Sequence, residues 1–146
     1  MEPCLGRRDH SLHGRATQWF GSHARSGWAS CPITQNRCVR IMSHPGYPHA
    51  LPVRAVIERL AEASASTFHM FWPDDFSLLD AQAVDSARIH GPRQLTDLYL
   101  LALAVGHLGH FVTFDSSVSI EAVRRARRNT SSTFEFLLLG SRWPLS

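Results

Sequence analysis

The feature that most constrains the fold is an apolar run that opens with an acidic residue. Leu98 to Leu108 is apolar on nearly every face of a helix, and Thr96-Asp97 stands at its start. A helix that is apolar all round is buried in the core of a protein. A short strand, His110 to Phe114, follows and ends at Asp115. Because a charge in an apolar run is costly unless it has a partner, both carboxylates need one.

Helical spacing and strand-like runs alternate along the chain. Apolar periodicity predicts helices over 10–24, 34–42, 52–63, 76–87, 94–108 and 120–128. Short apolar runs predict strands over 28–31, 68–72, 110–114 and 134–139. This alternation favours an α/β fold with a parallel sheet flanked by helices. We expect residues 1–9 to form an irregular lead and 10–146 a single domain.

Composition limits the function classes. With 146 residues and 44% hydrophobic content the chain can bury a real core. All fifteen basic residues are Arg, which suits bidentate recognition of phosphate but also fits a GC-rich genome. Three cysteines give no disulfide framework, so we expect a reducing cytoplasm. No stretch reaches about 18 apolar residues, which predicts no transmembrane helix.

Asp97 and Asp115 are the leading candidates for a site. Strand ends and helix starts converge at the carboxyl edge of an open α/β sheet, where ligands bind. Two carboxylates there suit a hard cation such as Mg²⁺, which keeps waters for substrate phosphates. Local rules explain each residue equally well: Asp97 favours a helix N-terminus, and Asp115 favours a turn.

Five segments, in their order and spacing, resemble the PIN-domain ribonuclease toxins of VapBC-type toxin–antitoxin systems. They are Gly27 to Asn36, Val39 to Pro48, Phe71 to Leu79, Gln94 to Leu100 and Phe111 to Asp115. The resemblance implies a three-layer PIN-like fold and a cluster of acidic residues that binds Mg²⁺ or Mn²⁺. It also implies cleavage of RNA phosphodiester bonds, a cognate antitoxin as partner, and a homodimer, with no membrane partner.

The resemblance assigns roles to six residues. Asp97 and Asp115 match the family's third and fourth acids, so both are expected as catalytic metal ligands. Four polar residues are expected to hydrogen-bond the carboxylates or the waters of the ion: Thr34, Gln35, Thr96 and Thr113.

Two departures from the family pattern predict a weakened enzyme. Residues 1–8 hold no Asp-x-Asn motif of a first strand, and Gln35 stands where the family usually has Glu. In the family that strand is central, and without it two neighbouring strands would lose backbone partners, at about 1–3 kcal/mol for each buried unsatisfied group. We therefore hypothesise a truncated or frameshifted relative. The alternative function is a catalytically inactive PIN-like protein that only binds an antitoxin or RNA.

Three arginines and an acidic pair have a functional and a structural interpretation. Arg40 could contact RNA phosphate, although its apolar neighbours favour an ion pair. Arg124 and Arg125 could form part of an RNA-binding face or a solvated helix end. Asp74-Asp75 has the composition of a metal-binding pair, but after Pro73 it is expected to form a turn and to cap the next helix.

Overall fold

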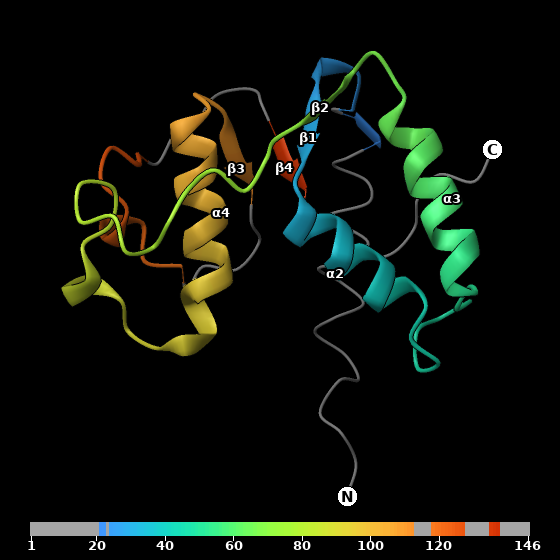
Figure 1. The fold of residues 1–146 in the computed structure, drawn as a ribbon, viewed down its shortest axis with the longest axis horizontal. Coiled ribbons are helices and arrows are strands. Elements are labelled where there is room, and N and C mark those ends of the chain that lie inside the picture. The colour runs from blue at the N-terminus through green and yellow to red at the C-terminus, as the bar shows by residue number, and fades with distance from the viewer. Residues whose placement is uncertain (1–20, 23, 113–117, 128–134, 138–146) are drawn as a thin grey trace, which may run out of the picture.

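Four short parallel strands form the sheet. The computed structural model describes residues 21–22, 24–112, 118–127 and 135–137. Within these ranges the strands are β1 (Trp28–Ser30), β2 (His69–Phe71), β3 (His110–Val112) and β4 (Glu135–Leu137), in the spatial order β2-β1-β4-β3. The α-helices are α2 (Pro32–Met42), α3 (Val53–Ser64) and α4 (Leu95–Gly106). The predicted α/β class with a parallel sheet is confirmed, and Figure 1 shows α4 and α3 at opposite ends of the sheet.

The last described strand lies inside the sheet. Phe136 of β4 is paired with Ala29 of β1 on one side and with Phe111 of β3 on the other. A strand in this position supplies backbone hydrogen bonds to both neighbours. The expectation that two strands would be left without partners is therefore wrong for β1 and β3, because β4 pairs with both.

Local signals explain where α2 and α4 begin. Pro32 occupies the first turn of α2, where its missing N–H has no helical partner to lose. The Cys31 N–H donates to the Thr34 hydroxyl (2.9 Å), and that hydroxyl donates to the Cys31 carbonyl (2.9 Å). A 3₁₀ turn, η3 (Pro92–Gln94), leads into α4. Both signals are local, so both helix starts fall close to the predicted positions.

Helix α4 is the buried element that its sequence predicts. Leu98, Leu100 and Leu103 are at most 1% exposed. One side of the helix packs on Ala29 and Trp72. The other side is covered by apolar residues from one earlier and one later segment: Val84, Val118, Ala122 and Val123. Apolar as α4 is, neither it nor any other described helix is long and apolar enough to cross a membrane.

The predicted helix over 76–87 is wrong. This segment forms turns, and its only helical part is the start of the 3₁₀ turn η2 (Ser86–Arg88). Side chains take backbone donors that a helix would need: Ser77 Oγ accepts from the Leu79 N–H (3.1 Å), and Asp80 Oδ1 accepts from the Gln82 N–H (2.9 Å). Such local bonds compete with helix formation.

The predicted basic helix over 120–128 is also wrong. Only Ile120–Ala122 is helical, as the 3₁₀ turn η4. Val123 then forms an antiparallel bridge with Val84, and Arg125 adopts a left-handed backbone conformation (φ 68°). Tertiary pairing with Val84 thus overrides the local helical pattern. The helix expected over 10–24 lies outside the described residues except at its last few positions.

Candidate functional site

Two helices begin near the carboxyl edge of the sheet. α2 starts two residues after the last residue of β1. α4 runs back from the same edge, because it joins β3 through a tight turn in which the Gly109 N–H donates to the Ala104 carbonyl (2.8 Å). Asp97 lies half-buried in the first turn of α4, with Thr96 exposed beside it. A carboxylate at this position is stabilised by the helix dipole.

The other expected ligand has no described position. Asp115 and its neighbour Thr113 lie between Val112 and Val118, outside the described residues. The convergence of Asp97 with Asp115 therefore stays a prediction. Within the described ranges, no three His, Cys, Asp or Glu side chains group closely enough to hold a metal ion. Of the expected ligand pair, this part of the chain contributes Asp97 alone, which is not a complete ligand set.

Thr34 and Gln35 lie in the first turn of α2 and are both engaged. The Thr34 hydroxyl is buried and bonds the backbone of Cys31, so its role in the fold is to cap the helix. The Gln35 amide nitrogen donates to Ser30 Oγ over 2.9 Å. This bond fixes one end of the amide on the sheet.

Ser30 and His69 are polar residues that sequence reasoning missed. Ser30 Oγ lies 2.7 Å from Nε2 of His69, across the pairing of β1 with β2. Ser30 is 5% exposed, and the Trp28 ring lies against the His69 ring with centroids 4.3 Å apart. Burial lowers the pKa of His69, while a hydrogen bond with the Ser64 backbone raises it in part. The two residues are 39 positions apart, and no local spacing signals their contact.

Asp74, shortly after β2, acts electrostatically on Cys31 and Tyr99. Burial, and next the nearby charge of Asp74, raise the pKa of Tyr99 to about 12. Burial likewise raises the pKa of the Cys31 thiol. A thiol needs a lowered pKa to act as a nucleophile at neutral pH, so these surroundings do not activate Cys31.

Asp75 forms a turn, as predicted, but caps no helix. Its N–H donates to the Pro73 carbonyl (2.8 Å), and its Oδ1 lies 3.0 Å from Nε2 of His107. The His107 ring stacks on Trp72, with centroids 4.9 Å apart and planes 8° from parallel. The pair therefore ties the segment after β2 to the end of α4.

The three candidate arginines are all exposed. Arg40 makes no ion pair with a described residue, so the favoured ion-pair interpretation stays a prediction that the described residues do not support. The Arg124 Nε donates to the Ala81 carbonyl (3.0 Å). Arg125 follows in its left-handed conformation. No described residue pairs with the guanidinium group of Arg40 or Arg125, so the described residues leave both groups available to bind phosphate.

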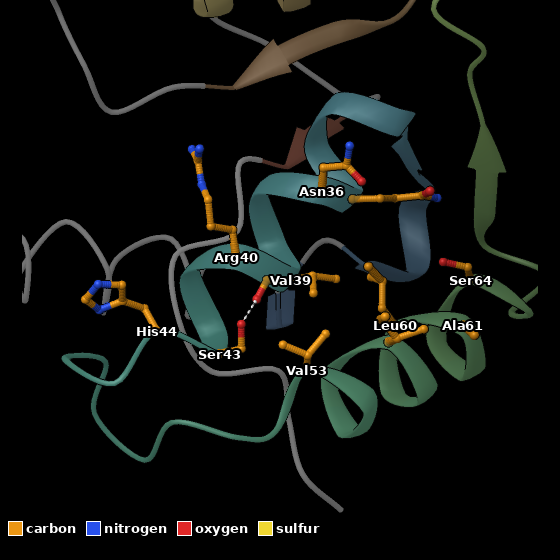
Figure 2. A pocket seen from close by; sticks show the side chains of 11 residues that line it. Asn36, Val39, Arg40, Ser43, His44, Val53, Leu60, Ala61 and Ser64 are labelled. Carbon is orange, nitrogen blue, oxygen red and sulfur yellow. Dashed lines mark hydrogen bonds between the residues drawn. The ribbon is translucent and has the colours of Figure 1, made fainter.

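A groove of about 760 Å³ lies between α2 and α3. Helix α3 buries Val56 and Leu60 against α2 but leaves Val53 and Ile57 about half exposed in the groove. Figure 2 shows Val53, Leu60 and Ala61 of α3 facing Val39 of α2, while Arg40 and His44 point away. The groove is therefore apolar, with the Arg40 guanidinium and the His44 ring at its rim.

Comparison with known proteins finds three informative relatives. Ribonuclease VapC44 of Mycobacterium tuberculosis H37Rv is 47% identical over 126 residues, covering 86% of this chain and 89% of the relative. Ribonuclease VapC39 of the same strain is 36% identical over 119 residues, 81% of this chain and 86% of the relative. Ribonuclease VapC38 is 37% identical over 119 residues, 81% of this chain and 82% of the relative. No family model and no solved structure matches the chain.

The fold and the site together define a class of protein: an α/β domain with a parallel sheet and an acidic helix start at its carboxyl edge. The identities above are more specific. The chain belongs to the VapC ribonuclease family of PIN-domain toxins, which confirms the resemblance seen in its sequence segments.

Proposed function

We propose that this chain is a Mg²⁺-dependent endoribonuclease toxin of a type II toxin–antitoxin system, with Mn²⁺ as an alternative ion. Asp97 and Asp115 are its proposed catalytic metal ligands. One observation carries the proposal: a chain of this family places Asp97 in the first turn of α4, near the carboxyl edge of the sheet. A divalent ion bound there would activate water for attack on phosphorus and neutralise charge on the leaving oxygen.

Cleavage of RNA with and without Mg²⁺ tests the proposal. We expect Asp97→Asn and Asp115→Asn each to lower the rate by at least about a hundredfold, since loss even of a residue that only supports the ligands costs about 10–100-fold. Asp80→Asn is the matched control, because its amide oxygen can still accept from the Gln82 N–H. Full cleavage by both site variants, or cleavage that persists in EDTA, would refute the proposal.

We propose further that the activity of this chain is reduced relative to its family. Gln35 contributes a neutral amide where the family usually has a carboxylate, so less negative charge attracts the ion. Gln35→Glu should lower the Mg²⁺ concentration that gives half-maximal cleavage. Robust cleavage by the 146-residue chain at low Mg²⁺, with no gain in the Glu variant, would contradict the reduced activity.

The groove between α2 and α3 supports a second candidate function, binding of a VapB-type antitoxin. Its exposed Val53 and Ile57 offer anchor sites for an apolar segment, since exposed apolar patches mark interaction surfaces. Ile57→Asp should weaken binding of the antitoxin, whereas Leu79→Asp should not, because Leu79 is 93% exposed and lies outside this groove. Equal weakening by both variants would exclude the groove. Light scattering of the free chain would test the expected homodimer.

Interactions with the RNA backbone are proposed for Arg40, Arg124 and Arg125. Removing one phosphate interaction should reduce the slope of log affinity against log salt by about 0.7–0.9. Measured on an Asp97→Asn background, replacement of these arginines by Gln should lower that slope, and an unchanged slope would exclude binding of phosphate by these side chains.

A further inference from the structure

A chain of hydrogen bonds runs from β2 through β1 to α2. His69 Nε2 lies 2.7 Å from Ser30 Oγ, and the Gln35 amide nitrogen donates to the same oxygen over 2.9 Å. Hydrogen bonding with the Ser64 backbone raises the pKa of the His69 ring in part, against the effect of burial. Because Nε2 faces Ser30, the bond with Ser64 uses Nδ1. The chain therefore links groups from four elements of the fold.

With His69 neutral, every bond in this chain has one donor and one acceptor. We assign the proton of the neutral ring to Nδ1, the nitrogen that does not face Ser30, which leaves Nε2 as an acceptor. The Ser30 hydroxyl then donates to Nε2, and its oxygen lone pair accepts from the Gln35 NH₂ group. An amide has its donor and acceptor on opposite ends. With its NH₂ held by Ser30, Gln35 must present its carbonyl oxygen outward.

We propose that Ser30 and His69 are positioning residues that decide which end of the Gln35 amide faces away from the sheet. The inference rests on the proposed function for one point only, the role of Gln35 toward the waters of the ion. Ion-bound water is a hydrogen-bond donor, so it needs the carbonyl oxygen of Gln35. Ser30 and His69 supply that orientation without touching the ion or the RNA.

Protonation of His69 reverses the chain. Both ring nitrogens then donate, and Nε2–H donates to Ser30 Oγ. The Ser30 hydroxyl hydrogen has to turn away from the ring, and Gln35 is its only other described side-chain partner. Gln35 can accept it only through Oε1, so the amide rotates and presents its NH₂ outward. One proton bound at Nε2 thus exchanges an outward acceptor for an outward donor.

The charge that drives this change is confined to His69. Trp28 and Ser30 of β1, Gln35 of α2 and the Ser64 carbonyl of α3 are the groups that face the ring, and none of them titrates near neutral pH. No charged group in the described part of the chain adds to the effects of burial and of Ser64 on its pKa. The ring is therefore neutral at pH 7.5 and gains its proton in acid.

Nuclear magnetic resonance of the free chain tests the inference without metal or RNA. The Gln35 side-chain NH₂ signals are assigned from their loss in Gln35→Glu, and the His69 ring is followed in the same samples from pH 8 to pH 5. In the wild type we expect the Gln35 NH₂ shifts to move with the His69 midpoint. In Ser30→Ala, His69 should still titrate while the Gln35 signals lose that midpoint.

Two further variants keep the test independent of folding defects in Ser30→Ala. His69→Asn should abolish the pH dependence of the Gln35 signals, and His90→Asn, an exposed histidine, should leave it unchanged. Gln35 signals that ignore the His69 midpoint in the wild type would overturn the inference. An inactive nuclease with coupled signals would refute the proposed function alone, and an active nuclease with uncoupled signals would refute the positioning role alone.

Discussion

An added methyl group should have opposite effects on stability at Gly109 and at Gly106, three positions away. A Cβ on residue 109 would collide with Cη2 of Trp72 and lie 2.7 Å from its Cζ2. Ordinary carbon contacts are about 3.5–4.0 Å, so the methyl or the indole would have to move by about 1 Å. Trp72 has no room to move, since it is 4% exposed, packed on α4 and stacked on His107.

The expected magnitudes separate the two positions clearly. Gly109→Ala should destabilise the fold by about 1–3 kcal/mol, the usual cost of overpacking. Gly106→Ala, at the last residue of α4 with no atom within 4 Å of its added Cβ, should stabilise it by up to about 0.5–1 kcal/mol. At about 2–4 °C per kcal/mol, the Tm values of the two variants should differ by about 3–16 °C.

Thermal unfolding followed by circular dichroism measures that difference, and a double variant locates its cause. In Trp72→Phe the smaller ring leaves space near Gly109, so adding Gly109→Ala to it should cost clearly less than adding it to the wild type. Such non-additivity is expected only of residues in contact. Equal Tm values for the two alanine variants, or a Gly109→Ala cost that is the same in the Trp72→Phe background, would refute the steric argument.

Three other predictions follow from the same contacts. Because burial lowers the pKa of His69 in the fold, the folded state binds fewer protons than the unfolded state. The free energy of unfolding should therefore keep its full value above the ordinary pKa of 6.5 and fall as the pH drops through the folded pKa. Denaturant titrations at pH 8 and pH 5 would measure the difference. Gln35→Glu should raise the pKa of His69. The new carboxylate must accept the Ser30 hydroxyl hydrogen, which leaves Ser30 Oγ free to accept from a protonated His69 ring. An unchanged His69 pKa in this variant would contradict the hydrogen-bond chain. Leu103→Ala should cost about 2–5 kcal/mol, whereas Arg54→Ala, which removes an exposed ion pair with Glu58 (2.7 Å), should cost at most about 0.5 kcal/mol; urea unfolding would compare them.

Much of the candidate site follows from local sequence. The position of Asp97 in the first turn of a buried helix depends on the apolar run behind it and on Pro92 before it. The same holds for Gln35, which Pro32 and Thr34 place in the first turn of α2. Sequence reasoning failed over 76–87, where hydrogen bonds from Ser77 and Asp80 to nearby N–H groups compete with a helix that the apolar spacing alone suggests.

The amino-acid sequence by itself determined the class of fold, the extents of α2, α3 and α4, and membership of the family, because helix caps and apolar spacing act within a few residues. Only the tertiary structure decided that β4 lies between β1 and β3 and that His69 meets Ser30. Both depend on the order and register of strands far apart in the chain. That register is selected by the packing of the whole sheet, and no segment of the sequence carries it alone.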